Sequence, residues 1–170
     1  MTVLDEIEAA IPALRRYSHA LVRDREAAED LVQDSLERAV ARHRTWRGDG
    51  PVRAWLFRIL LNRFRDNRRL AAGNLRLVPL ESVPLPSRPA SQDAHMDLRD
   101  VHEAMGRLPT DQRAALLLVA IEGFSLSEAA RVLDLPEGTV ASRVGRARGA
   151  LREMTGRPDR NLGSSKDLKR

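Results

Sequence analysis

Four polar residues in the last quarter of the chain have the spacing of one helix face: Thr139, Ser142, Arg143 and Arg146. Hydroxyl and guanidinium groups on an exposed helix face can hydrogen-bond to base edges and phosphates in the major groove of DNA. Another stripe of the same segment is apolar and would hold the helix on a core. That stripe comprises Val140, Val144, Ala147 and Leu151. The pattern predicts a DNA-recognition helix, on which Arg148 is a further cation.

The residues before this helix indicate a shorter helix and a tight turn. Ser125 and Glu128 have the spacing of a capping box, which begins a helix. Asp134-Leu135-Pro136 ends that helix, and Pro136 suits the opening turn of the next one. The two helices together form a predicted helix-turn-helix. Because such patterns are not specific, the alternative is an ordinary helical hairpin with solvated arginines.

Charge is distributed unevenly over the first half of the chain. Between Arg42 and Arg69 there are nine arginines and two acidic residues, a local charge of +7, whereas the whole chain carries +5. The preceding segment, Asp24 to Glu37, holds six acidic residues and one arginine. A basic surface suits nucleic-acid phosphates, and an acidic surface suits a protein partner. The alternative for each segment is a charged, solvated face of a helical bundle.

Two tryptophans, Trp46 and Trp55, flank a Gly48-Asp49-Gly50 turn in the basic segment. Aromatic side chains among arginines can stack on unpaired bases, at about 1–3 kcal/mol per base. With only six aromatic residues in the chain, most are expected in the core. Trp55 is the candidate for base stacking.

Apolar residues recur every three or four positions, and no segment alternates as a strand does, so the predicted fold is all-α. The first unit has periodic stretches at 7–21, 24–40 and 52–64. Their expected core residues include Val40, Trp55, Ile59 and Phe64. From 72 to 92 the periodicity stops and five residues are proline or glycine, which indicates a flexible but semi-extended linker. The expected domains are therefore 1–71 and 93–155, with a polar tail at 156–170.

The length of this linker allows the two units to contact separate sites. Fully extended, it would reach about 70 Å. Two turns of duplex DNA are also about 70 Å long. One DNA molecule could thus bind both units at once.

Composition excludes several classes of function. The chain has no cysteine, and its four histidines lack paired ligand spacing, so neither a metal nor a cofactor is expected. No Walker loop or nucleophile motif is present, so no catalytic residue is assigned and the chain is not expected to be an enzyme. No apolar run approaches the roughly 20 residues of a membrane span, and the amino terminus does not resemble a signal peptide. A cytoplasmic protein without membrane insertion is expected.

Several motifs together resemble the extracytoplasmic-function (ECF, group 4) sigma factors of the sigma-70 family. In the first unit these are Ala28-Glu29-Asp30-Leu31-Val32-Gln33-Asp34-Ser35, Trp46-Arg47-Gly48-Asp49-Gly50 and Arg53-Ala54-Trp55-Leu56-Phe57-Arg58-Ile59. In the second they are Leu108-Pro109, Gln112-Arg113, Pro136-Glu137-Gly138-Thr139-Val140, Ser142-Arg143 and Arg146-Ala147-Arg148. The resemblance implies a sigma region 2-like domain and a sigma region 4-like domain. Such a protein directs RNA polymerase to promoters and starts transcription under the control of an anti-sigma factor.

The resemblance also implies roles for particular residues. The β′ clamp helices of core polymerase would bind Asp30, Leu31, Gln33 and Asp34, and the β flap would be a further contact. The −10 element would meet the end of the basic helix and the loop after it, about Asn62 to Asn74. The candidates there are Trp55, Asn62, Arg65, Asn67, Arg68 and Arg69. The −35 element would meet Thr139, Ser142, Arg143, Arg146 and Arg148.

Two residues of the recognition helix depart from the family pattern. Ala141 stands where many relatives have lysine or arginine, and Gly145 replaces what is often a bulky residue. Both departures bear on the affinity for the −35 element.

Two other functions are consistent with parts of the chain. A sigma-like decoy would sequester an anti-sigma factor without binding DNA, but it would be expected to lose the basic recognition face. A stand-alone helix-turn-helix regulator would not need the acidic and basic helices of the first unit.

Overall fold

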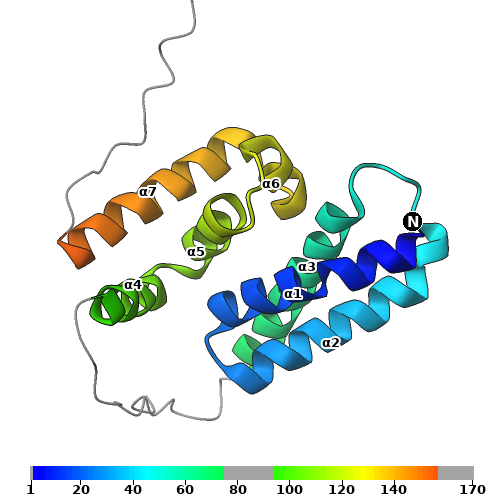
Figure 1. The fold of residues 1–170 in the computed structure, drawn as a ribbon, viewed down its shortest axis with the longest axis horizontal. Helices are drawn as coiled ribbons and strands as arrows, with labels where there is room; N and C mark the ends of the chain where they lie inside the picture. Colours follow the sequence, from blue (N-terminus) through cyan, green and yellow to red (C-terminus); the bar gives the residue numbers. More distant parts are fainter. Residues whose placement is uncertain (1, 75–93, 157–170) are drawn as a thin grey trace, which may run out of the picture.

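The computed structural model describes residues 2–74 and 94–156, and the regular structure in these ranges is entirely helical (Figure 1). The first module contains α1 (Val3–Val22), α2 (Arg25–Arg42), the short 3₁₀ turn η1 (His43–Thr45) and α3 (Val52–Asn74). The second contains α4 (Ala94–Arg107), α5 (Thr110–Leu116), the π-helical turn η2 (Leu117–Ile121), α6 (Leu126–Leu133) and α7 (Glu137–Thr155). Helix α3 continues into the start of the expected linker. The rest of that linker, and the tail beyond Gly156, lie outside the described residues.

Local sequence signals set several helix ends. Asp24 begins α2, because its carboxylate accepts a hydrogen bond from the Ala27 N–H at 2.7 Å. Ser125 and Glu128 form both bonds of a capping box at the start of α6. Asp134 ends α6 in a left-handed conformation (φ 55°), and α7 starts directly after Pro136. The predicted helix-turn-helix is confirmed.

The three helices of the first module pack around a shared apolar core. Its largest fully buried side chains are Leu14, Tyr17, Leu21, Leu56, Phe57, Leu60 and Leu61. The prediction for Val40 was wrong, because its side chain is 48% exposed. Ala39 takes the buried position, and Val40 is turned from it by the roughly 100° that separates successive helical residues. On α3 the fully buried aromatic residue is Phe57, whereas Trp55, Ile59 and Phe64 are only partly buried.

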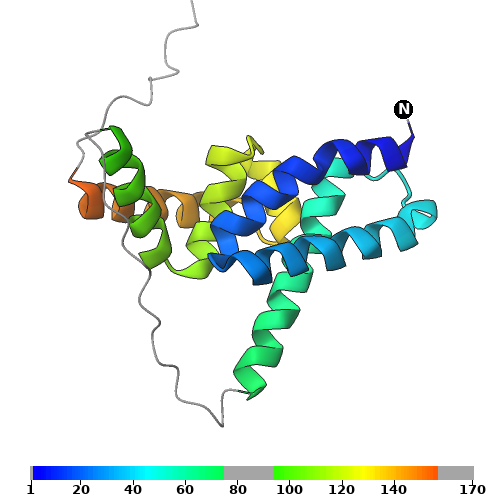
Figure 2. The same cartoon turned by 60° about the horizontal axis from the view of Figure 1, so that its bottom comes forward.

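The second module lies directly against α1 and α3 of the first (Figures 1 and 2). The rings of Tyr17, Phe57 and Phe124 meet edge-to-face, with centroids 5.2 Å apart in each pair. Phe124 belongs to the second module, so this aromatic row joins the two cores into one. The Tyr17 hydroxyl also donates to the Ala114 carbonyl at 2.9 Å. The sequence predicted two units on a tether but gave no sign of this docking.

Polar side chains complete helix ends across the same boundary. Arg113 of α5 is buried and donates through Nε and a terminal nitrogen to the Leu21 carbonyl near the end of α1, at 3.2 and 2.9 Å. Burial lowers the pKa of the Arg113 guanidinium. In the other direction, Arg65 of α3 donates to the Leu133 carbonyl at the end of α6, at 2.8 Å. Each module therefore supplies a cation to a helix carboxyl end of the other, where backbone carbonyls lack intrahelical partners.

Candidate nucleic-acid interface

Helix α7 presents a polar face to solvent because its apolar stripe is buried. Val140, Val144 and Ala147 are at most 3% exposed. On the other side Ser142 and Arg146 are exposed, and Thr139 is half-buried. Arg143 is also half-buried, and one of its terminal nitrogens lies 3.9 Å from a carboxylate oxygen of Asp111. The structure thus brings together the hydroxyl and arginine groups that the sequence predicted as one DNA-facing surface.

Arg148 does not share this surface. It lies two residues after Arg146, which turns it by about 200° around the helix. Its side chain lines an apolar groove of about 470 Å³ between α4, η2 and α7, together with Leu98, Ile121 and Leu151. The expectation that Arg148 joins the other arginines on one face is therefore not met.

The two positions that depart from the family pattern are both exposed to solvent. Ala141 and Gly145 are exposed on α7. A Cβ atom added at Gly145 would meet no heavy atom within 4 Å. Backbone at this point of the helix is therefore directly accessible to a partner.

The basic helix α3 extends as one unbroken helix through Asn74. The segment from Asn62 to Asn74, expected to include a loop, is therefore helical throughout, and the residues that follow lie outside the described range. Asn62, Asn67, Arg68 and Arg69 are exposed on it. Arg68 also lies over the Phe64 ring, 5.8 Å from its centroid. Arg65 differs from these residues, because it is half-buried against α6.

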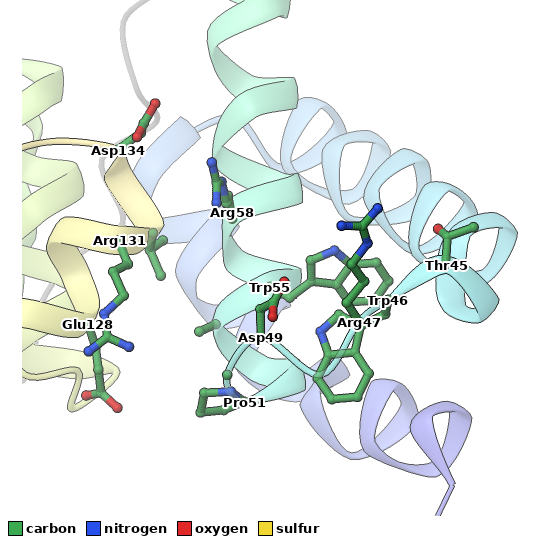
Figure 3. A pocket seen from close by; sticks show the side chains of 13 residues that line it. Thr45, Trp46, Arg47, Asp49, Pro51, Trp55, Arg58, Glu128, Arg131 and Asp134 are labelled. Atoms are coloured by element: carbon green, nitrogen blue, oxygen red, sulfur yellow. The ribbon is translucent and has the colours of Figure 1, made fainter.

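A pocket of about 440 Å³ opens at the start of α3 (Figure 3). The first module contributes the Trp46 and Trp55 rings, whose centroids are 6.5 Å apart, together with Arg47, Asp49 and Arg58. The opposite wall is formed by α6, from which Glu128, Arg131 and Asp134 line the pocket. Indole rings beside arginine donors and a carboxylate acceptor can stack on a nucleobase and bond to its edge. Sequence reasoning did not assign Arg47, Asp49 and Arg58 to a site, although the paired tryptophans around the turn indicated it.

The acidic helix α2 presents Asp30, Gln33 and Glu37 to solvent. Gln33 donates to Glu37 at 3.1 Å. Asp34, next to them, is half-buried and pairs with Arg38 at 3.4 Å and with Arg63 of α3. An apolar groove of about 570 Å³ borders this face, with Leu4, Leu36 and Val40 among its lining residues.

Leu31 does not belong to the exposed acidic face. Its side chain is 2% exposed and packs in the core of the first module. The structure therefore brings together Asp30, Gln33 and Asp34 but sets Leu31 apart, since about 100° of helix rotation separates it from Asp30.

None of the helices within residues 2–74 and 94–156 combines the length and the apolar character that a membrane crossing requires.

Two family models match the chain, one for each module. The model described as the sigma2 domain of PhyR matches residues 7–61, and the model described as sigma-70 region 4 matches residues 98–151. Among curated proteins, the ECF RNA polymerase sigma factor EcfG of Rhodopseudomonas palustris is 37% identical over 147 residues, covering 86% of this chain and 81% of EcfG.

Solved structures also align with most of this chain. The sigma factor RpoE of Bartonella quintana, solved in complex with the anti-sigma factor NepR, aligns with a TM-score of 0.78 at 35% identity, covering 91% of this chain and 97% of RpoE. The anti-anti-sigma factor PhyR of the same organism aligns with a TM-score of 0.60 at 17% identity, which shows a likeness of fold alone. That alignment covers 89% of this chain and 50% of PhyR.

Proposed function

The chain belongs to the ECF RNA polymerase sigma factors, and on that premise we propose that its two modules divide promoter recognition between them. A sigma factor is not itself an enzyme; it directs the polymerase to a promoter, where the polymerase carries out the chemistry. The first module, within 1–71, binds core polymerase and the −10 element. The second, within 93–155, binds the −35 element. Both act in the cytoplasm, where polymerase and chromosome meet.

The −35 element lies against the polar face of α7. Arg146 and Ser142 are exposed there and have no side-chain partner within residues 2–74 and 94–156, so they can bond to base edges. Arg143 is held at the edge of that face near Asp111 and is suited to a phosphate. We assign Arg148 no base contact, because it lines the groove on the other side of the helix.

The −10 element lies along α3 and ends in the tryptophan pocket. Exposed Asn62, Arg68 and Arg69 offer amide and guanidinium donors to the backbone and bases of the separating strands. In the first module, the rings of Trp46 and Trp55 offer an aromatic surface for a base that has left the stack. Arg47, Asp49 and Arg58 of the same module would distinguish that base by its edge.

Core polymerase docks on the acidic face of α2. Asp30, Gln33 and Asp34 form a charged and polar surface beside an apolar groove, a combination suited to a partner with both basic and apolar side chains. The β′ clamp helices are the proposed partner here, and the β flap is the proposed partner of the second module. Leu31 supports this surface from beneath.

An anti-sigma factor is the proposed regulator. The related RpoE was solved bound to one. In this chain the groove lined by Leu98, Ile121 and Arg148 is mostly apolar, with exposed leucine and isoleucine side chains at 70% and 54%. Such a groove fits the apolar face of an amphipathic helix.

The observation that carries this function is the exposed hydroxyl and arginine face of α7, seated on a helix-turn-helix in a chain that aligns with sigma factors along most of its length. The test is in vitro transcription with purified core polymerase on genomic fragments, with mapping of the start sites. Start sites that depend on adding the chain, and that share −10 and −35 sequences, are expected. Identical transcripts with and without the chain would refute the proposal.

A decoy for an anti-sigma factor is the second candidate, because the family model that matches residues 7–61 is named for PhyR. Against it, the recognition face of α7 retains Ser142 and Arg146 in exposed positions. A decoy would bind an anti-sigma factor but would neither co-elute with core polymerase nor support initiation, so the same transcription experiment separates the two.

A further inference from the structure

Glu122, at the end of η2 in the second module, is a buried carboxylate that pairs with two arginines of the first module. Its side chain is 0% exposed. Arg16 of α1 forms two bonds to it, Nε to Oε1 at 3.0 Å and a terminal nitrogen to Oε2 at 2.8 Å. Arg53 of α3 donates to Oε2 and also to the Glu122 backbone carbonyl, both at 2.8 Å. We call Arg16, Arg53 and Glu122 the latch.

The latch is built into the aromatic contact between the modules. The Arg53 guanidinium lies 4.6 Å from the ring centroid of Phe124 and 5.3 Å from that of Phe57. A cation between two aromatic faces is stabilised by both rings. The same side chain therefore binds the carboxylate, the backbone and the aromatic ring of the second module, which fixes one docking geometry.

Docking covers surfaces that the proposed function needs. Arg65, a −10 candidate, is bonded to the Leu133 carbonyl. The tryptophan pocket has α6 as its second wall, so Arg131 and Asp134 close one side of it in the docked form. In addition, two modules in contact cannot reach promoter elements that lie about two duplex turns apart.

We propose that this docked arrangement is an intrinsic closed state, held by the latch, which keeps the free sigma factor from engaging both promoter elements until polymerase separates the modules. The inference rests on the proposed function. It requires no inhibitor, because the partners of Glu122 are all within the chain. Removing any one of these charges weakens the pairing of the buried Glu122 carboxylate at the interface, so it should favour separation.

The test measures the distance between the modules in the free, full-length chain. The sequence contains no cysteine, so Ala9→Cys and Glu153→Cys, both at exposed positions, give two unique sites for spin labels. The otherwise unchanged chain is expected to give one narrow distance distribution. Glu122→Gln and Arg16→Gln should each add a broad population at longer distances. The population of the docked form should fall accordingly.

Two matched controls remove the same charges elsewhere. Glu103→Gln changes an exposed carboxylate of the second module, and Arg15→Gln changes the neighbour of Arg16, which pairs with Glu29 inside the first module. Both should keep the narrow distribution. Circular dichroism of every variant checks that the helices remain. If Glu122→Gln fails to fold, Arg16→Gln still tests the proposal. The Arg16 side chain is 53% exposed, so its replacement should leave the fold intact.

A binding assay without polymerase links the latch to function. The apparent affinity for two-element promoter DNA scales with the open fraction, so Glu122→Gln should raise it by about tenfold or more. Affinity for a duplex with the −35 element alone should not change, because the polar face of α7 is already exposed. A narrow distance distribution in both latch variants, or an unchanged two-element affinity, would overturn the proposal. If the unmodified chain still directs initiation with core polymerase, the proposed function stands despite that failure.

Discussion

Arg146 and Arg148 lie two positions apart on one helix, yet they have different surroundings. Arg146 is exposed on the polar face of α7, whereas Arg148 lines an apolar groove on the other side. Because both are arginines in the recognition helix, both were candidates for DNA contact. Their separation follows from the helix period, which sequence reasoning applied to the apolar stripe but not to this pair.

Arg146→Ala is expected to weaken binding to a cognate promoter by about 1–3 kcal/mol, because a bidentate contact to guanine is lost. Electrophoretic mobility shifts on a set of −35 variants measure this, and the loss should disappear when the contacted base pair is already changed. Arg148→Ala is the matched control and should leave −35 affinity nearly unchanged. A uniform loss over all sequences would assign Arg146 to a phosphate instead.

The double variant Gln33→Ala/Asp34→Ala is expected to abolish co-elution with core polymerase in gel filtration. Gln33 is exposed, and the half-buried Asp34 pairs with Arg38 and Arg63 outside the apolar core, so the fold should be retained. Glu153→Ala, which removes an exposed carboxylate from α7, is the control. Full binding by the double variant would exclude the acidic face as the docking surface.

Leu31→Ala has a different expected result. Because Leu31 is buried, its truncation should lower the free energy of unfolding by about 2–5 kcal/mol. Denaturant titration measures that loss. A polymerase-binding defect in this variant would follow from instability and should recover at lower temperature, if the core still folds there.

At the scale of the helices, side-chain signals set most of the boundaries. The capping box predicted the start of α6, and the left-handed Asp134 lies where the turn was expected. These features were predictable because the interactions are local, within three or four residues. The core of α3 was less predictable, because Phe57 rather than Trp55 meets Tyr17 and Phe124, and that choice depends on the second module.

Two glycines give a test of this local physics. Gly145→Ala should raise helix stability by about 0.5–1 kcal/mol, because the position is exposed, helical and open to a Cβ atom. Gly123→Ala should destabilise the protein, since Gly123 has φ +73° and alanine is strained there. Thermal unfolding measures both changes. A lower melting temperature for Gly145→Ala would show that glycine has a packing role on α7.

At the scale of the whole molecule, the two units could be predicted from the sequence, but the interface between them is seen only in the structure. Periodicity and charge predicted two helical units and their order. They did not predict the interface, because its partners are distant in sequence: Arg16 lies 106 residues from Glu122, and Arg113 lies 92 residues from Leu21. Tertiary contacts of this kind have no local pattern to reveal them. The same is true of the tryptophan pocket, which takes its walls from both modules.

The length of the tether gives a prediction at this scale. Deleting ten residues between 76 and 92 would shorten the maximum reach by about 34 Å, to roughly half of two duplex turns. Initiation at promoters with both elements should fall sharply, while the docked state should persist. Replacing the same ten residues by glycine and serine preserves the length and should preserve initiation in a run-off assay. Equal initiation after the deletion would mean that the two elements are not bound simultaneously.

Tyr17 is the only tyrosine of the chain, and its ring is fully enclosed between the two modules. Burial raises the pKa of its phenol above the ordinary value of 10.0. The phenol therefore loses its proton more readily when the halves have moved apart, and alkaline conditions favour that parted form. The ultraviolet absorbance of Tyr17 can thus report the separation of the two modules, and no foreign label is needed.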